Sequence, residues 1–242
     1  MSKDKPIYKR VLLKLTGEVF ASDKYDLDAE SASLIAEEIN SIHKLGVDIG
    51  VVVGGGNIVR GAGLAENGYF KMTRTDADEI GMIATLINAR FLKSALTSLN
   101  IESRVLSAIE IKSFAEPFIY GRALKHLDKR RVVIFATGTG NPYVTTDTAA
   151  VIRANQINAD ALLKCTHIDG VYSDDPKKNQ KATLIQTIKY TDVMSAQLKF
   201  MDLAALDMAN REFKKPIHVF DILKTGNLKK VLCGSIIGSK VS

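Results

Sequence analysis

Three consecutive glycines, Gly54, Gly55 and Gly56, follow a short apolar run at 49–53 and precede Arg60. Because glycine has no Cβ and tolerates positive φ, backbone N–H groups in such a turn can approach an anion closely. The arginine adds a planar fork that suits phosphate oxygens. A lone glycine pair would indicate only a tight turn between a strand and a helix. Three glycines with a nearby arginine favour a phosphate-binding loop.

Two common phosphate-binding motifs do not fit this loop. A dinucleotide-binding fingerprint that begins at Gly54 requires a glycine where Val59 stands. A P-loop that begins at Gly56 has Gly61 in place, but Ala62 stands where its lysine is required. The loop is therefore a phosphate site of another kind, or a plain turn.

A lysine and a second glycine turn come before this loop. Lys14 stands in an apolar run, two residues before Thr16–Gly17. Such a lysine either reaches solvent along its aliphatic stem or supplies a fixed point charge at the end of a strand. Beside two glycine turns, the second interpretation is favoured, and we place Lys14 in the active site.

The segment 137–146 (TGTGNPYVTT) brings hydroxyl groups, an amide and free N–H groups to the start of a predicted helix. This combination predicts an anion site. The structural alternative is that Thr145 or Thr146 is an N-cap and that Asp147 favours the helix dipole. Capping and ligand binding can coexist.

The segment 164–176 (KCTHIDGVYSDDP) fits two interpretations about equally well by residue type. One is a hairpin with a solvated acidic turn. The other is a site for the edge and ribose of a nucleotide, in which Tyr172 stacks and Asp175 accepts hydroxyl protons. Asp78, at the start of a long helix, is either a dipole partner or a ligand group.

These groups must be positioned by strands that alternate with helices. β-Branched apolar runs predict strands, and apolar stripes with helical spacing predict helices. The alternation predicts a mostly parallel sheet covered by helices on both faces, in one domain over residues 1–242 with a sublobe from about residue 140. The predicted strands are 9–15, 49–53, 104–106, 131–136, 160–164, 170–172, 216–220 and 236–238, and the predicted helices are 29–45, 76–99, 121–127, 147–155 and 202–211.

The helix at 76–99 is apolar on nearly every side. We expect such a helix to be buried, either in the core or in a subunit interface. Since it has more apolar faces than one core can cover, we expect it at a two-fold contact between subunits.

Composition bounds the class of protein. The chain has 242 residues, 46% hydrophobic and 25% charged, and a formal net charge of +6, which suits a globular protein with anionic substrates. The basic residues are scattered without interleaved aromatic residues, which disfavours nucleic-acid binding. Two cysteines do not make a disulfide framework, and no pair of histidines has metal-ligand spacing. Without a secretory signal or a bilayer-long apolar run, we expect a cytoplasmic protein without membrane partners.

The resemblance to a known family rests on several motifs in a fixed order. They are KLTGE at 14–18, VVVGGGNIVRG at 51–61, DADEIGM at 76–82, TGTGNPYVTTDTAA at 137–150, KCTHIDGVYSDDP at 164–176 and MDLAA at 201–205. From about Tyr8 to the C-terminus, the chain resembles the bacterial uridylate (UMP) kinases of the amino-acid kinase family. Cys165, His167 and Asp174 depart from the usual pattern on the adenine side.

The resemblance implies a three-layer α/β/α sandwich with a mostly parallel sheet, and transfer of the γ-phosphoryl group of ATP to UMP. It implies an N-terminal part that binds UMP and a part from about residue 140 that binds ATP. Mg²⁺ would enter with ATP on phosphate oxygens and waters, without an assigned protein ligand. It further implies a homohexamer built as a trimer of dimers, with GTP as a possible activator and UTP as a possible inhibitor.

The same resemblance assigns roles by position. The implied ATP contacts are Lys14, Leu15, Thr16, Gly17, Gly56 and Arg60 for the phosphates, with Thr166, Tyr172 and Asp175 for the nucleoside. The implied UMP contacts are Gly55, Asp78, Thr139, Gly140, Asn141, Pro142, Tyr143, Val144, Thr145 and Thr146. The implied catalytic residues are Lys14 and Arg60, with Asp147 and Asp202 as organisers of the lysines and of magnesium-bound water.

Two alternative functions remain open at this point. One keeps the fold and uses a carboxylate or carbamate as acceptor, as in glutamate-type kinases; Asp78 and the segment 137–147 argue against it. The other is a nucleotide-binding regulator without turnover. The presence of both Lys14 and Arg60 argues against a regulator.

Overall fold

The computed structural model describes residues 5–59, 72–174, 178–179 and 181–242. Within this part of the chain, nine strands form one sheet in the order β4-β3-β5-β2-β1-β6-β10-β11-β9. The strands from β4 to β10 run parallel, and β11 pairs antiparallel with β10. Their bounds are β1 (Arg10–Leu15), β2 (Asp48–Val53), β3 (Ser103–Ser107), β4 (Glu116–Pro117), β5 (Val132–Ala136), β6 (Ala161–Thr166), β9 (Thr187–Ile188), β10 (Ile217–Asp221) and β11 (Ser239–Val241).

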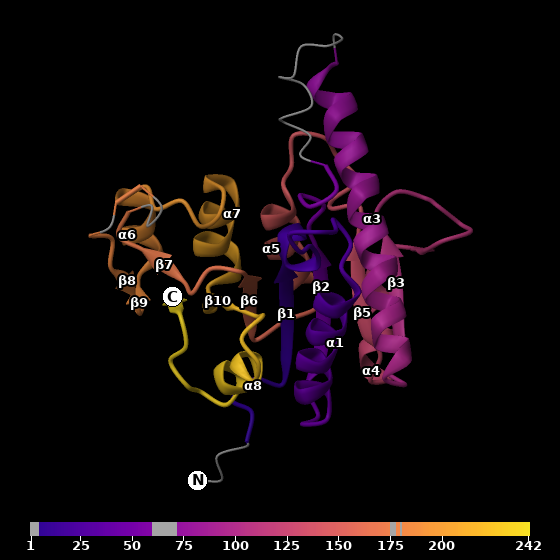
Figure 1. Ribbon diagram of the computed structural model, residues 1–242, viewed down its shortest axis with the longest axis horizontal. Helices are drawn as coiled ribbons and strands as arrows, with labels where there is room; N and C mark the ends of the chain where they lie inside the picture. The colour runs from indigo at the N-terminus through magenta and orange to yellow at the C-terminus, as the bar shows by residue number, and fades with distance from the viewer. Residues whose placement is uncertain (1–4, 60–71, 175–177, 180) are drawn as a thin grey trace.

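Helices cover both faces of this sheet, as Figure 1 shows. One face packs against α1 (Ala29–His43), α3 (Arg74–Ser98) and α8 (Asn227–Leu232). The other packs against α4 (Tyr120–Asp128), α5 (Thr146–Gln156), α6 (Tyr190–Ser195) and α7 (Leu203–Met208), and a π-helical turn (Ala209–Phe213) continues from α7. The three-layer arrangement with a mostly parallel sheet confirms the predicted fold class. A separate antiparallel pair, β7 (Val171–Tyr172) with β8 (Leu184–Ile185), lies outside the main sheet.

The central strand β1 shows how the sequence prepares the site. Alternate residues of a strand point to opposite faces of the sheet. Val11, Leu13 and Leu15 enter the core beneath α1, whereas Leu12 enters the core beneath α5. Lys14 follows Leu12 on the α5 face, where the pattern of the strand calls for an apolar residue.

The neighbouring strand β6 repeats this arrangement. Leu163 and Cys165 belong to the α1 side and Leu162 to the α5 side, so Lys164 occupies the position that Lys14 has in β1. The two lysines are direct neighbours in the register of the parallel pair. Parallel pairing therefore puts two ammonium groups side by side at the carboxyl end of the sheet.

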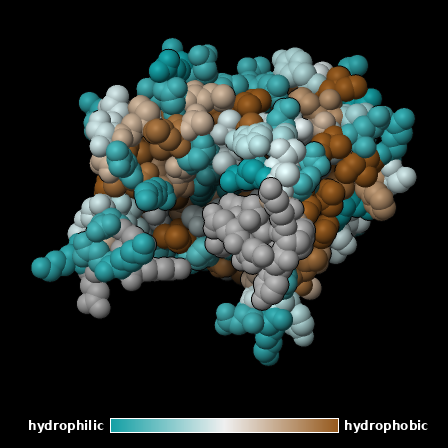
Figure 2. Space-filling view, turned by 90° about the horizontal axis from the view of Figure 1, so that it is seen from above, coloured by the Kyte–Doolittle hydropathy of each residue, from teal (hydrophilic) through white to brown (hydrophobic). Residues whose placement is uncertain are grey.

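The long helix α3 begins at Arg74, two residues earlier than predicted. Thr73 and Asp76 form a capping box that satisfies the first free N–H groups of the helix. The prediction that this helix is buried within the chain's own core is wrong for one stripe of side chains. Ile80, Ile83 and Ile87 form this stripe and are 40–52% exposed. Figure 2 shows hydrophobic residues gathered along the flank where α3 lies. The interface half of the prediction stays a prediction.

Other boundaries differ for identifiable reasons. The last strand is β11 at Ser239–Val241 and not 236–238, because Gly238 has a φ of +68° and forms the turn before it. Asp202 is the N-cap of α7 and not its first residue. A 3₁₀ turn (Gly17–Phe20) and the elements β4, β8, β9, α6 and α8 were not predicted, because they are too short to show a period. Within the described residues, every helix falls short of the length or the apolarity that crossing a bilayer would demand.

Candidate active site

A buried carboxylate lies between two lysines at the carboxyl end of the sheet. The Nζ atoms of Lys14 and Lys164 lie 2.8 Å from Oδ1 and Oδ2 of Asp147, respectively. The three side chains are only 7–14% exposed. The contact of Lys14 is an ion pair without hydrogen-bond geometry, whereas Lys164 donates a hydrogen bond to Asp147 and another to the carbonyl of Phe200. The structure thus brings the predicted Lys14 and Asp147 together and adds Lys164.

The pKa values of Asp147 and Lys164 in this cluster are strongly shifted. Burial raises the pKa of Asp147, but the two lysines outweigh burial and bring this pKa to about 2. Burial and the nearby charge of Lys14 lower the pKa of Lys164 to about 8, against the opposing attraction of Asp147. Near neutral pH the cluster therefore carries two positive charges and one negative charge in a site largely removed from water.

The two glycine turns pack against each other beside this cluster. A Cβ atom on Gly17 would lie 2.4 Å from the amide nitrogen of Gly56, and one on Gly54 would lie 2.8 Å from the amide nitrogen of Gly17. Real Cβ atoms do not approach backbone so closely, so both positions require glycine. The N–H of Gly54 donates to the carbonyl of Leu15, which ties the turn to β1. The two turns therefore pack backbone against backbone at one edge of the sheet.

A buried hydroxyl at this edge has no partner among the described residues. The Oγ1 atom of Thr16 is buried and makes no hydrogen bond to any of them. Buried polar atoms are nearly always satisfied, so an orphan beside Lys14 and a glycine turn indicates a bound oxygen ligand. Leu15, by contrast, is fully buried in the core and only its backbone faces the turn.

The N-terminus of α5 forms the next wall of the site. Thr145 is the N-cap, and its hydroxyl accepts from the N–H groups of Asp147 and Thr148. The same hydroxyl donates to Asp202, which also accepts from Thr148 and caps α7. Asp202 therefore links the starts of two helices. It faces hydroxyls and an N–H group, and it adds only a longer-range attraction to Lys164.

A pocket of about 150 Å³ opens between the glycine turn, α3 and the segment before α5. Its lining includes six predicted UMP contacts, namely Gly55, Asp78, Asn141, Val144, Thr145 and Thr146, together with Gly56 from the predicted ATP set. Val59, Gly81, Met82, Thr85 and Gly138 complete it. Residues far apart in the sequence thus converge on one pocket of mixed polar and apolar lining beside the glycine turn.

Asp78 is already engaged by the protein. Its carboxylate accepts from Nε of Arg74 at 2.9 Å and from the backbone N–H of Tyr143 at 2.8 Å. Tyr143 has a φ of +66° and is 69% exposed. Asp78 therefore fastens the loop at 139–144 to the start of α3.

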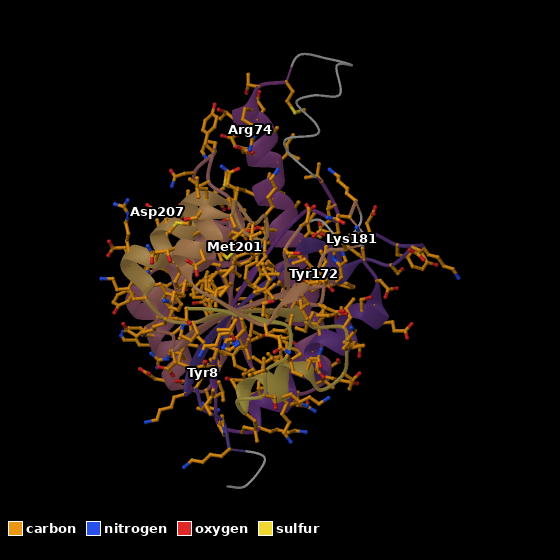
Figure 3. The ribbon with its side chains drawn as sticks, turned by 90° about the vertical axis from the view of Figure 1, so that its left-hand side faces the viewer. Tyr8, Arg74, Tyr172, Lys181, Met201 and Asp207 are labelled. Carbon is orange, nitrogen blue, oxygen red and sulfur yellow. The ribbon has the colours of Figure 1, made fainter. Side chains whose placement is uncertain are left out.

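The remaining predicted residues lie around these groups or outside the described part. Thr139 accepts from the N–H of Asn141, and Gly140 packs against Ala108. Pro142 lies in the same loop, between Asn141 and Tyr143. Thr166 ends β6 and Tyr172 lies in β7. Figure 3 shows Tyr172 and Met201 above the sheet and Tyr8 at its opposite end. Arg60 and Asp175 lie outside the described residues.

Sequence reasoning missed three residues at this site. The sequence did contain a pattern that could have identified Lys164. The tripeptide LLK occurs at the same place in two strands, at 12–14 and 162–164. Thr85 and Asn88 are buried polar residues of α3 that contact the loop after β5 and the glycine turn at 54–57, respectively. Their places in a mostly apolar helix were a weak signal that the chain alone does not distinguish from ordinary buried polar residues.

The parallel sheet, the paired lysines and the interlocked glycine turns are the features that a kinase with an open α/β fold would need to hold phosphate without a P-loop. A model of the amino acid kinase family matches residues 9–221. The chain belongs to this family.

Within this family, the chain is similar to uridylate (UMP) kinases. The chain is 52% identical over 226 residues to a uridylate kinase from Rickettsia bellii (strain RML369-C), with 93% of each chain covered. The crystal structure of UMP kinase from Bacillus anthracis has a TM-score of 0.92 at 40% identity, covering 97% of this chain and 96% of that one. UMP kinase from Ureaplasma parvum gives 0.89 at 35% identity, with 97% and 98% covered. The likeness extends over nearly the whole chain.

The buried cluster generates a prediction about stability. Asp147→Asn leaves two buried ammonium groups without their counter-charge, so we expect the free energy of unfolding to fall by about 3–5 kcal/mol. Adding Lys164→Met should recover part of this loss, because it removes one uncompensated charge. Urea unfolding at pH 7 measures both effects.

A matched control is Asp207→Asn, which breaks an exposed pair with Arg211 and should cost less than about 1 kcal/mol. If Asp147→Asn unfolded at the same urea concentration as the wild type, the cluster would not be the buried ion pair described above.

Proposed function

We propose that the chain is a UMP kinase, which transfers the γ-phosphoryl group of ATP to UMP and gives UDP and ADP in pyrimidine nucleotide synthesis. The observation that carries the proposal is the pair of lysines held by Asp147 beside two interlocked glycine turns and a pocket. Similarity to uridylate kinases along nearly the whole chain supports it.

The reaction joins two anions, so the enzyme must bring them together and neutralise their charge. An oxygen of the UMP phosphate attacks the γ-phosphorus, and the bond from that phosphorus to the oxygen bridging to the β-phosphate breaks as ADP leaves. Because the attacking phosphate is already largely ionised, no protein base is needed. Positioning and electrostatic stabilisation supply the catalysis.

The site offers a group for each of these tasks. The ammonium groups of Lys14 and Lys164 face the transferred phosphoryl group and stabilise the charge that shifts towards ADP. N–H groups of the turns at Gly17 and Gly56 hold phosphate oxygens, and Arg60 adds a fork to them. Asp147 keeps both lysines in place.

The two substrates approach from the two halves of the chain. UMP lies in the pocket of Gly55, Asp78 and the segment 139–146, whereas the nucleoside of ATP lies against Thr166, Tyr172 and Asp175. The N-terminal part of the single domain thus binds the acceptor, and the part from about residue 140 binds the donor.

Magnesium enters as part of the substrate MgATP. The described residues contain no group of three metal-ligating side chains, and the carboxylates of Asp147 and Asp202 are engaged by lysines, hydroxyls and an N–H group. This donor set fits an ion held by phosphate oxygens and waters, with Asp147 and Asp202 orienting its waters. The ion would neutralise part of the phosphates' negative charge.

A coupled assay of ADP release tests the proposal directly. We expect turnover with UMP that exceeds turnover with CMP or AMP, and none with glutamate or carbamate. Turnover with a carboxylate or carbamate instead of UMP would favour the glutamate-type alternative. Tight nucleotide binding without ADP release would favour a regulator.

Assembly and regulation form the finer part of the proposal. The chain forms a homohexamer in the cytoplasm, a trimer of dimers, and responds to GTP as activator and UTP as inhibitor. A basic pocket of about 330 Å³, lined by Lys93, Arg104 and Lys112 with Glu116 as its carboxylate, supports polyphosphate binding away from the active site. Titrating GTP and UTP into the ADP-release assay checks the response.

The exposed isoleucines of α3 give a test of assembly. Ile83→Lys puts a charge in the middle of the stripe, so we expect light scattering to show a smaller species than the wild type. Ile236→Lys, which changes an isoleucine near the C-terminus that is more exposed than Ile83, should leave the mass unchanged. A wild-type monomer at all concentrations would contradict the proposed interface.

The low pKa of Lys164 predicts how activity depends on pH. Because the charged lysine stabilises the transition state, kcat/KM for MgATP should fall above about pH 8. The depressed pKa also makes the folded state bind fewer protons than the unfolded state between pH 8 and 10.5. This group's contribution to the free energy of unfolding therefore rises in that window, so the loss of activity is not due to unfolding by Lys164.

Lys164→Arg isolates this effect. Arginine does not titrate here, so the decline near pH 8 should disappear from whatever activity the variant retains. Lys125→Arg, on an exposed position of α4, should keep the wild-type profile. An unchanged decline in Lys164→Arg would assign the titration to another group.

The position of Asp78 predicts discrimination between UMP and dUMP. Among the described contacts, Oδ1 of Asp78 keeps one acceptor position beside Arg74, which a ribose hydroxyl can use. Losing a hydrogen bond to a charged group costs roughly 1.5–3 kcal/mol. We expect kcat/KM for dUMP to be on the order of ten- to a hundred-fold lower than for UMP. Asp78→Asn should narrow this gap, mainly by weakening UMP.

Asp76→Asn is the matched control, since it changes the same group one half-turn earlier, in the capping box. It should lower the melting temperature and keep the UMP/dUMP ratio. If Asp78→Asn did only this, Asp78 would be a helix-terminal residue and not a reader of the sugar.

A further inference from the structure

One face of α3 carries polar or small residues at positions 78, 81, 85 and 88. Spacings of three and four residues put them in a row along the helix. Asp78, Gly81 and Thr85 line the acceptor pocket, and Asn88 lies one turn further along. The row therefore runs past both phosphate-side loops.

Thr85 fastens the loop that leaves β5. Its hydroxyl is buried, accepts from the N–H of Thr137 at 2.7 Å and donates to the carbonyl of Met82 at 2.8 Å. Thr137 has a φ of +59°, which is a strained conformation for a β-branched residue and must be held by its surroundings. This residue directly precedes Gly138, which lines the acceptor pocket.

Asn88 fastens the other loop. It is fully buried, and its Nδ2 donates to the carbonyl of Gly54 at 2.7 Å and to Oδ1 of Asn57 at 2.7 Å. The amide of Asn57 donates back to Oδ1 of Asn88 at 3.2 Å. Both ends of the glycine turn are thus bonded to one side chain of α3.

The helix also touches the turn directly between these two side chains. A Cβ atom on Gly55 would lie 2.9 Å from Cβ of Ala84 and 3.0 Å from the carbonyl oxygen of Gly81. Backbone contact on this side leaves the turn no room to move towards α3. The hydrogen bonds of Asn88 hinder movement away from it.

We propose that Thr85 and Asn88 are positioning residues, which use α3 as a rigid bracket to fix the distance between the glycine turn at 54–57 and the acceptor loop that follows Thr137. This inference rests on the proposed function, since the turn holds the transferred phosphate and the loop holds the acceptor. Misplacing reacting groups by about 1 Å can cost about a hundred-fold in rate. The two residues act through the loops and do not touch the reacting atoms.

A purely structural role makes a different prediction. Buried polar groups that merely satisfy one another would lower stability when removed, and would leave the turnover of the remaining folded protein unchanged. The test therefore needs a readout of geometry as well as a readout of stability.

The test compares Thr85→Val and Asn88→Asp with the wild type in the ADP-release assay. Valine removes the hydroxyl at nearly constant volume, and aspartate puts an oxygen where Nδ2 of Asn88 donates to Gly54. We expect kcat to fall ten- to a hundred-fold in each variant, with KM for UMP and MgATP within about threefold of the wild type. Thr85→Ser, which restores the hydroxyl, should recover most of the turnover.

Two control variants change residues of α3 outside the row that contacts the two loops. Thr97→Val makes the same chemical change where the hydroxyl donates only to the carbonyl of Lys93 within α3, and should keep wild-type kcat. Leu96→Ala opens a cavity in the core and should lower the melting temperature while kcat stays within twofold. If Asn88→Asp failed to fold, Asn88→Ala would replace it.

Hydrogen exchange of the protein without substrates supplies a readout that does not depend on the reaction. Peptides that cover 50–59 and 137–145 should exchange faster in the Thr85 and Asn88 variants, but not in Leu96→Ala. Normal kcat, or exchange that merely follows the melting temperature as in Leu96→Ala, would overturn the inference. A wild type without UMP kinase activity would instead overturn the proposed function, and the exchange pattern would still decide the role of the bracket.

Discussion

The carboxylate of Asp147 lies between two lysine ammonium groups, and the rest of the site depends on this contact. Neither lysine could remain charged at the buried end of a sheet without a counter-charge. The contact exists because β1 and β6 are parallel neighbours and α5 starts directly above them. A fold that separated these two strands would lose the cluster, even with every residue unchanged.

The glycine turns let the backbone approach a phosphate closely. In a P-loop, one turn wraps a phosphate and carries its own lysine. Here two turns pack backbone against backbone, and the lysines come from the strands. The requirement for glycine at Gly17 and Gly54 thus follows from contact between the turns themselves, as well as from any ligand. This explains why P-loop spacing fails in a chain whose residue types still favour phosphate.

Much of this could be predicted from local pattern, and the remainder depends on contacts between distant segments. Strand and helix periodicity gave the layers and the mostly parallel sheet, and Lys14 was identified from its apolar neighbours and the following turn. Lys164 has the same local pattern, but its role depends on pairing with Lys14 across 150 residues of chain, which periodicity does not reveal. The same holds for Asn88, whose partners Gly54 and Asn57 lie more than thirty residues away. The exposed stripe of α3 was expected to be covered, because amphipathic pattern cannot distinguish a chain's own core from a partner's surface.

The charge balance of the cluster connects its structure to its chemistry. One carboxylate cannot neutralise two ammonium groups, and burial prevents water from doing so fully. The depressed pKa of Lys164 is the physical sign of this imbalance. When an anionic phosphoryl group binds, it supplies the missing negative charge and therefore raises the pKa of Lys164. Negative charge that moves towards the lysines during transfer is then stabilised by groups already fixed in place, with little reorganisation at the moment of reaction. The same imbalance that costs the folded protein stability therefore favours the state in which phosphate is being transferred.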